Sequence, residues 1–589
     1  MTSTEDRVCQ NCKSSFQIDA SDFDFYTKID VPPPTFCPEC REIRRIAFRN
    51  ERALYRRKCD LCGKTVVSRV SPDKPYPMYC KECWWSDRWD PLSYAAEYDF
   101  SRPFFEQFSG LLNKVPHISI FNSNTVNSDW VNQETDDKNC YLNVGGHYNE
   151  DSAYNTYELY GKNSLDNFWF LNSEFGYENI SCKRCYRVVG SRDCFDCQDA
   201  YFSHDCRNCS NVFGCAGLRN KKYCVFNEQR TKEEYEIFMR ENPICSRISY
   251  DVQEKKAHEV WRTVPRRFAA INKSVEVSGD NIDESKNAHH CFAAEKVENA
   301  KYVYIGGWIR DSYDLTSHGA AELVYECSSG GGEYDAKFVT YCMSGDPLRQ
   351  MHSSHLTYCF GLITSDYCFG CVGLRNKKYC ILNKQYTKEE YEALVPKIIA
   401  HMNEMPYAGK NGRTYRYGEF FPIELSPFGY NETAAIDYYP LTREEALAKG
   451  YPWCDYEPET KHEFSDYEIP DDVKDVKDDI LEKVLKCEAS GKPYRIIPME
   501  LQFYRTMGLP IPRKAPLQRH KERMGRVLPR RLFARECGCA GKTSENGKYA
   551  NTGKHVHGEG RCGARIETPY APNRPENVYC EECYQAEIY

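Results

Sequence analysis

A step of twelve residues recurs through the middle of the chain and constrains its fold more than any other feature. The step is marked first by Asn139, Asp151 and Asn163, and then by three cysteine pairs: Cys182 with Cys185, Cys194 with Cys197, and Cys206 with Cys209. Twelve residues are too few for two helices, and the segment is rich in Tyr, Val, Phe, Asn and Gly. The pattern predicts a β-solenoid, in which short strands stack through turns and successive coils bury one another.

The repeat region is itself duplicated. The string from Phe213 to Cys224 recurs from Phe369 to Cys380, at an offset of 156 residues (369 − 213). Both copies continue into a segment with Thr followed three residues later by Glu, the pattern of a helical capping box. We expect two solenoid halves, residues 139–245 and 246–400, each ended by a helical cap that covers the open strand edge.

The beginning of the chain also recurs near its end, at an offset of 478 residues (487 − 9). In the second copy most of the cysteines have been replaced. The first copy has Cys9, Cys12, Cys37 and Cys40, and the corresponding residues of the second are Cys487, Ser490, Ala515 and Gln518. We expect the first copy to bind zinc and the second to keep the same fold without it.

Eight cysteines precede residue 84, and all of them lie in Cys-x2-Cys pairs, which allow two thiolates to reach one tetrahedral ion. The expected ligands are Cys9, Cys12, Cys37 and Cys40 in a treble clef, and Cys59, Cys62, Cys80 and Cys83 in a zinc ribbon. Four thiolates complete the coordination of zinc and leave no position for a reactant, so we expect both ions to be structural.

A second ribbon follows the ligand-poor copy, and we expect its ligands to be Cys537, Cys539, Cys580 and Cys583. It is 22 residues longer than the first, since Cys537 and Cys580 are 43 residues apart whereas Cys59 and Cys80 are 21 apart. The insertion carries three further candidate ligands, His555, His557 and Cys562. Cys562 could replace one of the four cysteines, and the histidines either complete a second or altered site or lie in a solvated loop. The sequence therefore predicts about three structural zinc ions.

Basic residues follow the second knuckle of each treble clef, and in the first copy their spacing of three or four places them on one helical face. They are Arg41, Arg45, Arg49, Arg52 and Arg56 in the first copy, and Arg519, Lys521, Arg523, Arg526 and Arg530 in the second. Such a stripe beside a zinc fold predicts contact with nucleic-acid phosphates. The alternative is an ordinary solvated helix face with glutamate partners.

The cysteines of the repeat region have two interpretations. With a period of twelve, Cys185, Cys197 and Cys209 would stack as an inward ladder of small apolar groups. Alternatively, two adjacent pairs would hold zinc or an iron–sulfur cluster. The second half keeps only one comparable pair, Cys368 with Cys371. The pattern favours packing, because a structural role survives such a loss more readily than a cofactor site does.

The composition limits location and partners. The formal net charge is -8 and the sequence pI is near 6.0, so an anionic partner would have to meet a local basic patch. Neither a secretory leader nor a long apolar run is present, so we expect a cytoplasmic protein without a membrane span, whose 32 cysteines are reduced or bind metal.

The expected segments are 1–95 (treble clef and ribbon), 96–138 (connector), 139–245 and 246–400 (the two solenoid halves), 401–485 (connector) and 486–589 (ligand-poor treble clef and ribbon).

The sequence from Cys9 to Arg41, with its two knuckles, Phe-Tyr and Pro-x-Pro, resembles the zinc-ribbon and treble-clef domains of large multi-cysteine proteins from candidate-phylum bacteria. Some of those proteins carry a CoA-transferase label, but no acyl-CoA site is recognisable in this chain. The resemblance implies a multidomain, mainly β fold with treble-clef and zinc-ribbon modules at both ends of a duplicated solenoid. It implies no activity.

These features predict a non-enzymatic zinc-binding protein that binds nucleic acid or a ribonucleoprotein through its basic helices. The alternative is a protein-interaction scaffold that uses the Tyr-rich solenoid surface. A treble-clef nuclease is the enzyme class that comes nearest, but it needs an open metal position, and the all-thiolate sites argue against one. The oligomeric state does not follow from the sequence.

Overall fold

The computed structural model describes residues 4–342, 353–457 and 463–588. The chain divides into two compact units, each built from two separate segments. One unit combines residues 1–120 with 270–457, and the other combines 121–269 with 458–589. Each unit therefore pairs one terminal module with one half of the repeat region. The predicted fold class is confirmed: the protein is mainly β, with a duplicated solenoid and cysteine clusters in both terminal modules.

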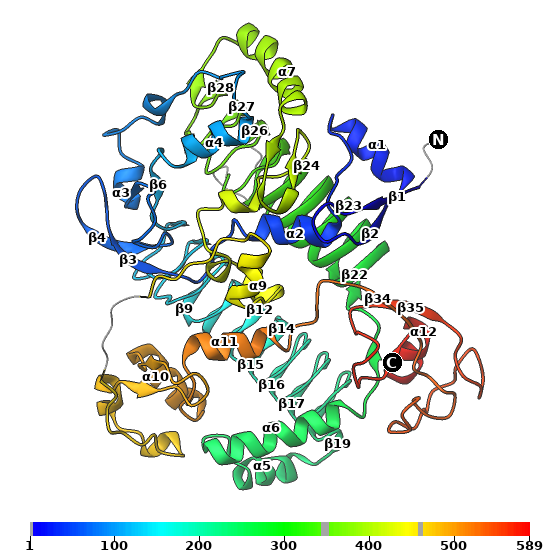
Figure 1. Ribbon diagram of the computed structural model, residues 1–589. Helices are drawn as coiled ribbons and strands as arrows, with labels where there is room; N and C mark the ends of the chain where they lie inside the picture. The colour runs from blue at the N-terminus through cyan, green and yellow to red at the C-terminus, as the bar shows by residue number, and fades with distance from the viewer. Residues whose placement is uncertain (1–3, 343–352, 458–462, 589) are drawn as a thin grey trace. The chain divides into compact units, whose positions relative to one another are not determined.

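The repeat region forms parallel coils of twelve residues, in which each strand pairs with the strand one coil later. Lys162 pairs with Glu174 and Tyr186 with Gln198. The strands stack side by side in Figure 1. The eight-stranded sheet of the second unit consists of β9 (Glu150–Ala153), β11 (Lys162–Leu165), β13 (Glu174–Tyr177), β15 (Tyr186–Val189), β16 (Gln198–Tyr201), β17 (Ser210–Phe213), β18 (Lys222–Val225) and β19 (Glu228–Gln229). A second side of the same coils is formed by β10 (Thr156–Leu159), β12 (Phe168–Leu171) and β14 (Ile180–Lys183).

The other solenoid half forms a nine-stranded sheet in the first unit. Its strands are β21 (Ile271–Asn272), β22 (Val275–Asp283), β23 (Lys286–His318), β24 (Ala321–Gly330), β25 (Glu333–Lys337), β26 (Ser353–Thr357), β27 (Asp366–Phe369), β28 (Lys378–Ile381) and β29 (Lys384–Gln385). Thr340 pairs with Phe360, which is twenty residues later instead of twelve. Equivalent residues of the two halves are therefore 148 positions apart before this point, as Asp166 and Asp314 are, and 156 positions apart after it, as Phe213 and Phe369 are.

A left-handed residue occurs at every third position of the coils. Tyr154, Tyr157, Tyr160 and Asn163 have φ values of 62, 56, 53 and 47°. Each coil of twelve residues therefore contains four left-handed residues, which bend the chain into four short sides. Asn and Asp adopt this conformation more readily than most residues do, which explains their abundance in the repeat.

Each coil is narrow, and the residue after each left-handed position points into it. At Gly161 an added Cβ would lie 2.0 Å from Glu158 Oε1, so this position has no room for a side chain. The buried cluster of the later coils contains Cys, Val and Ala, together with a single Phe. The limited width of a twelve-residue coil therefore favours small side chains, and cysteine is one of them.

The predicted helical caps are confirmed. They are α5 (Lys232–Glu241) and α7 (Lys388–Glu404). Thr231 and Thr387 each accept a hydrogen bond from the backbone N–H three residues later, and a Glu side chain completes each capping box. In the second unit α6 (Arg247–Trp261) follows α5 along the coils, as Figure 1 shows.

The two treble-clef copies have matching elements. The first consists of β1 (Glu5–Val8), β2 (Ser15–Ile18), α1 (Ala20–Lys28) and α2 (Pro38–Ile46). The second consists of β32 (Leu485–Lys486), β33 (Pro493–Tyr494), α10 (Pro498–Met507) and α11 (Pro516–Met524). In the first unit α2 packs on β23 and β24, and in the second α10 packs on β11. The N-terminal module thus lies on the second solenoid half, and the C-terminal module lies on the first.

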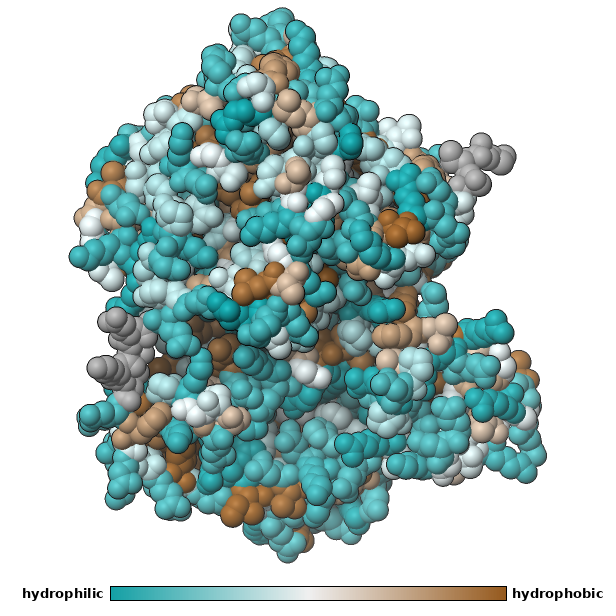
Figure 2. All heavy atoms as spheres, in the orientation of Figure 1, coloured by the Kyte–Doolittle hydropathy of each residue, from teal (hydrophilic) through white to brown (hydrophobic). Residues whose placement is uncertain are grey.

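The remaining strands and α-helices lie mostly in the ribbons and the connectors. They are β3 (Tyr55–Lys58), β4 (Thr65–Ser68), β5 (Met78–Tyr79), α3 (Lys81–Trp84), α4 (Phe104–Leu112), β6 (His117–Ile118), β7 (Asn122–Ser123), β8 (Glu134–Thr135), β20 (Arg266–Arg267), β30 (Tyr407–Ala408), β31 (Thr414–Tyr415), α8 (Ala435–Tyr438), α9 (Arg443–Ala448), β34 (Phe533–Glu536), β35 (Arg565–Thr568), β36 (Val578–Tyr579) and α12 (Glu581–Ile588). The parallel pairing of β7 with β8 shows that coils begin inside the expected connector 96–138. The face drawn in Figure 2 is mostly hydrophilic, with hydrophobic residues scattered over it.

Candidate metal centres and the buried arginines

Within the described residues, four groups of cysteine and histidine could each hold a metal ion. In each group the ligand atoms all lie within 4.8 Å of one another. The groups are Cys9, Cys12, Cys37 and Cys40; Cys59, Cys62, Cys80 and Cys83; Cys537, Cys562, Cys580 and Cys583; and Cys539, His555, His557 and Cys583. The structure thus brings together both ligand sets predicted for the N-terminal module.

The local fold explains how each N-terminal group forms. Cys9 and Cys12 lie in the turn between β1 and β2, whereas Cys37 caps α2 and Cys40 lies in its first turn. Two thiolates bound to zinc at about 2.3 Å in a tetrahedron are about 3.8 Å apart. The Sγ atoms of Cys12 and Cys37 are 3.6 Å apart, which fits such an ion.

The ribbon site has the same construction, with Cys80 capping α3 and Cys83 within it. The Sγ atoms of Cys62 and Cys80 are 3.8 Å apart. N–H groups point at the sulfurs: the Cys80 amide lies 3.2 Å from Cys59 Sγ, and Arg88 donates to Cys83 Sγ at 2.6 Å. Such donors stabilise the thiolate form that a metal requires.

In the C-terminal ribbon the four predicted cysteines divide between two candidate groups, in line with the alternative in which Cys562 replaces one of them. Cys562, not Cys539, joins Cys537, Cys580 and Cys583, and the Sγ atoms of Cys562 and Cys580 are 3.9 Å apart. Cys539 faces His555 and His557 instead. The physical reason is the Cys-x-Cys spacing at Cys537, because one intervening residue does not form the knuckle that lets both thiolates reach the same ion. The pKa of Cys580 is lowered to about 5, chiefly by its hydrogen bond with Cys537.

The ligand-poor copy keeps the knuckle with only one of the four cysteines, Cys487. The Cys487 amide donates to the Lys492 carbonyl at 2.9 Å, and the Gly491 amide donates to the Cys487 carbonyl at 2.9 Å. In the first copy the Cys9 amide donates to Ser14 at 2.9 Å, in the equivalent position. The backbone hydrogen bonds of this turn are therefore common to both copies, and in the second copy the Ser490 amide also donates to Cys487 Sγ at 3.4 Å.

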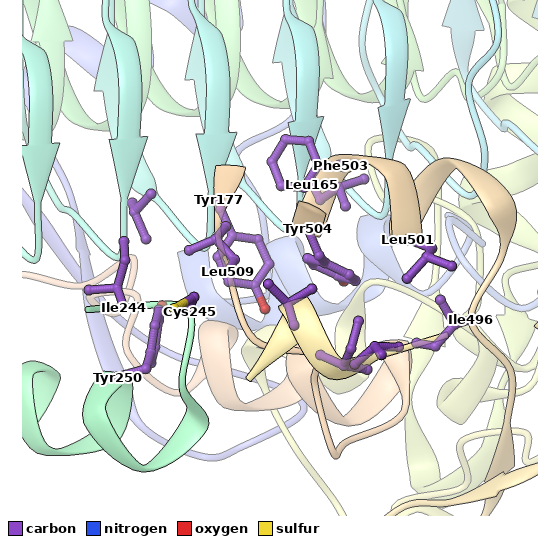
Figure 3. Close-up of a cluster of buried hydrophobic side chains, with 14 of the residues drawn as sticks. Leu165, Tyr177, Ile244, Cys245, Tyr250, Ile496, Leu501, Phe503, Tyr504 and Leu509 are labelled. Atoms are coloured by element: carbon purple, nitrogen blue, oxygen red, sulfur yellow. The ribbon is translucent and has the colours of Figure 1, made fainter. Parts of the chain in front are cut away.

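Apolar packing supports the ligand-poor copy. Figure 3 shows Phe503, Tyr504 and Leu509 beside Leu165 and Tyr177 of the solenoid. All five side chains are buried. Burial of this kind contributes roughly 1.5–3 kcal/mol for each large apolar side chain, so it stabilises this copy without any contribution from a metal.

The solenoid cysteines form the predicted inward ladder. Cys185, Cys197 and Cys209 are buried in one cluster with valine and alanine. Cys185 Sγ lies 3.4 Å from the carbonyls of both Lys183 and Cys194, as expected of a neutral thiol donor. In the other half, burial raises the pKa of Cys291 to about 12. These features favour packing, and the four metal groups found among the described residues all lie in the terminal modules.

No disulfide joins any of the 32 cysteines, all of which lie in the described part of the chain. This agrees with the expectation of reduced or metal-bound thiols.

Three of the five stripe arginines in the first treble clef are buried, which corrects the role predicted for these three. Arg41, Arg45 and Arg49 are at most 2% exposed. Arg41 Nε and Arg45 Nη1 each lie 3.0 Å from a carboxylate oxygen of Asp314, whose side chain is fully buried. Arg49 donates to Ser329 at 2.7 Å. These guanidinium groups face the solenoid and are not available to a nucleic-acid phosphate.

The second copy repeats this arrangement. Arg519 Nε lies 2.9 Å from Asp166 and Arg523 Nη1 lies 3.3 Å from it, with all three side chains buried. Arg519 also lies 5.1 Å from the ring centre of Tyr154, as Arg41 lies 5.3 Å from that of Tyr302. Arg519 and Arg523 therefore cannot contact nucleic acid either.

The other predicted phosphate contacts lie nearer the surface. Arg56 and Lys521 are exposed, and Arg52, Arg526 and Arg530 are half-buried. Arg526 lies 3.6 Å from Glu254. For these five residues the contact with nucleic acid stays a prediction.

A charged cleft of about 500 Å³ lies in the second unit and was not predicted. It is lined by residues of α6, α11 and the loop before α11, including Glu254, His258, Arg513 and Glu522. Burial raises the pKa of Glu254 to about 7 and lowers that of His258 to about 4. Its lining comes from separate segments of the chain, so no local sequence pattern marks it.

Comparison with known proteins identifies no family for this chain. No protein-family model matches it, and no curated protein matches it. A crystal structure of a protein described as an acetyltransferase from Desulfovibrio desulfuricans G20 is similar at 10% identity and a TM-score of 0.10, over 46% of this chain and 71% of that one. A TM-score this low carries no inference about fold or function.

In the described part of the chain, no helix is both long enough and apolar enough to cross a membrane. The cytoplasmic location and the resemblance to candidate-phylum proteins stay predictions.

Proposed function

We propose that the protein is a non-enzymatic, zinc-stabilised scaffold that binds a protein partner on an outward face of its solenoid. The observation that carries this proposal is a pair of stacked, exposed tyrosines. Tyr148 and Tyr160 are 40% and 46% exposed, and their rings stack at 4.9 Å with an angle of 8° between them. This separation equals the spacing of adjacent strands, about 4.8 Å.

The coil period supports the scaffold proposal because it repeats side chains at a fixed distance. In the other unit His355, Tyr367 and Tyr379 stack in the same way, with ring centres 4.2 and 5.1 Å apart. Tyrosine combines a large apolar ring with a polar hydroxyl and loses little conformational entropy on binding, so it is enriched at protein interfaces. Because the backbone holds the rings in a fixed stack, less conformational entropy is lost when a partner binds to them.

The zinc assignment and the lack of catalysis are part of the same proposal. Each metal group supplies four protein ligands, so an ion bound there has no open position for water or a substrate. Cysteine and histidine at these distances suit zinc. We infer that the ions hold the terminal modules in shape.

The test removes the stacked tyrosines and follows partner capture. Wild-type protein should retain a partner whose crosslinks map near Tyr148 and Tyr160, and Tyr148→Ala/Tyr160→Ala should lose it by at least tenfold. Phe464→Ala is a matched control, because Phe464 is 46% exposed but lies outside the solenoid. Capture that is unchanged in the double variant, or crosslinks confined to another surface, would refute the proposal.

A further inference from the structure

Two ligand groups in the C-terminal ribbon share one thiolate. Cys583 completes the group of Cys537, Cys562 and Cys580, and it also completes the group of Cys539, His555 and His557. We propose that both groups are filled at once, by two zinc ions bridged through the Cys583 sulfur. This inference concerns the ribbon alone and does not depend on the scaffold proposal.

The distances in the second group fit a tetrahedral ion. With Zn–S near 2.3 Å and Zn–N near 2.0 Å, a sulfur and a nitrogen on the same ion are about 3.5 Å apart. His557 Nε2 lies 3.5 Å from Cys539 Sγ and 3.2 Å from Cys583 Sγ. His555 Nδ1 lies 3.8 Å from Cys539 Sγ. Both imidazoles thus turn a nitrogen toward the sulfurs at ligand spacing.

A carboxylate fixes the orientation of one imidazole. His555 Nε2 lies 2.6 Å from Glu587 Oε1, and both side chains are almost fully buried. The Thr552 and Gly553 amides donate to the same carboxylate at 2.9 and 3.1 Å. A proton on Nε2 leaves the Nδ1 lone pair free for a metal, which is the usual arrangement of a zinc-binding histidine with its supporting carboxylate.

The charge balance favours two ions over one. Four thiolates around a single Zn²⁺ leave a net charge of −2 in a buried site. The second ion adds +2, while Cys539 adds one further negative charge and the histidines add none, so the pair carries −1. A lower net charge costs less to bury. Asn551 also donates to Cys539 Sγ at 3.2 Å, as expected beside a thiolate.

The inserted segment needs such an ion to hold its shape. Between β34 and β35 the described pairing consists of isolated bridges, such as Cys539 with Ser544. Val556, between the two histidines, is 89% exposed. A segment with so little apolar burial gains its order from ligation, as small zinc modules do. The insertion that lengthens this ribbon carries the three extra ligands His555, His557 and Cys562.

The test counts metal ions on the full-length protein purified with zinc. Native mass spectrometry should find four ions per wild-type chain, one for each ligand group. His555→Ala/His557→Ala should lose one ion and keep three. His289→Ala is the matched control, because that half-buried histidine lies in the solenoid and should keep all four. Three ions in the wild type, or four in the double variant, would overturn the proposal.

A second measurement tests the bridge without any substitution, so a folding failure cannot obscure it. After replacement of zinc by cadmium-113, two of the four NMR resonances should show mutual scalar coupling through the shared sulfur. Four uncoupled resonances would exclude the bridge. Cys583→Ser should release both C-terminal ions, whereas the two N-terminal ions should remain bound.

Discussion

Buried arginine–aspartate pairs hold each treble clef to its solenoid half. Asp166 forms ion pairs with Arg519 and Arg523. Its counterpart in the other unit, Asp314, forms ion pairs with Arg41 and Arg45. A buried pair contributes little net stability relative to an apolar contact, but loss of one partner leaves an uncompensated charge. These pairs therefore specify which surfaces meet.

Asp166→Ala should lower the free energy of unfolding by about 3–5 kcal/mol, because two buried guanidinium groups, those of Arg519 and Arg523, lose a shared carboxylate partner. Asp196→Ala is the control: its pair with Arg184 is about half exposed, so the loss should stay below about 1 kcal/mol. Denaturant titration measures both. Equal losses in the two variants would contradict the assigned role of Asp166.

The interior of the early coils is polar, and Glu158 lies fully buried within it. Burial raises the pKa of Glu158 from 4.5 to about 8. The unfolded chain loses this proton at a lower pH than the folded chain does. Stability from this group is therefore complete below about pH 4.5 and is lost as the pH rises toward 8.

Between these limits the wild type should lose about 1.4 kcal/mol per pH unit relative to Glu158→Gln, whose amide does not ionise. Denaturant titrations of both proteins from pH 5 to 9 give this difference. Parallel pH profiles of the two proteins would show that Glu158 is already ionised in the fold.

At the scale of elements, the two treble clefs reach one fold by different means. The first has four cysteines at metal-ligand spacing in addition to its buried aromatic pair, whereas the second keeps only Cys487 of that set and has the aromatic packing of Phe503 and Tyr504 without a metal group. The hydrogen-bonded knuckle is common to both. The order of the first copy should therefore depend on metal more strongly than that of the second.

Removal of metal by a chelator should increase amide hydrogen exchange by at least tenfold in β1 and β2, because their turn loses its ligated thiolates. Exchange in β32 and β33 should change less than twofold, which provides a control within the same chain. Mass spectrometry of proteolytic fragments resolves the two hairpins. Equal deprotection of both would contradict the independence of the second copy from metal.

The solenoid cysteines give a further prediction. Cys194→Ala/Cys197→Ala should leave the metal content unchanged and cost about 1 kcal/mol per site, comparable to the removal of a methyl group from a core. Metal analysis and denaturant titration check the two parts separately. A lost ion would revive the interpretation of these pairs as ligands.

At the scale of the whole molecule, the formal net charge is -8, and five of the arginines predicted to contact phosphate are buried. Non-specific affinity for nucleic acid comes from cations that can approach phosphate and release counter-ions. With five of these arginines paired internally, general attraction to nucleic acid should be weak.

Fluorescence anisotropy with duplex DNA and single-stranded RNA at 150 mM salt should give dissociation constants above about 10 μM. Lys521→Glu, at an exposed position of α11, should change them less than twofold. Tight, salt-sensitive binding that Lys521→Glu weakens would restore the basic-helix function in place of the scaffold.

Local spacing determined much of this protein. Cys-x2-Cys spacing brings two thiolates within reach of one ion, so the two N-terminal groups of four cysteines were predictable from the sequence. The twelve-residue period likewise predicted the coils and the inward positions of Cys185, Cys197 and Cys209. In both cases the partners are set by chain geometry over a few residues or by an exact repeat.

Tertiary structure alone decided the rest. The N-terminal module lies on the second solenoid half, and Arg41 meets Asp314 across 273 residues of sequence. Nothing in the helix containing Arg41 distinguishes a solvated cationic face from a buried one, because the distinction lies in the charge of the surface it meets. The division of Cys562 and Cys539 between two groups depends in the same way on how a long insertion folds back. Local geometry fixes contacts within a motif, whereas packing and charge complementarity between distant segments fix what that motif is used for.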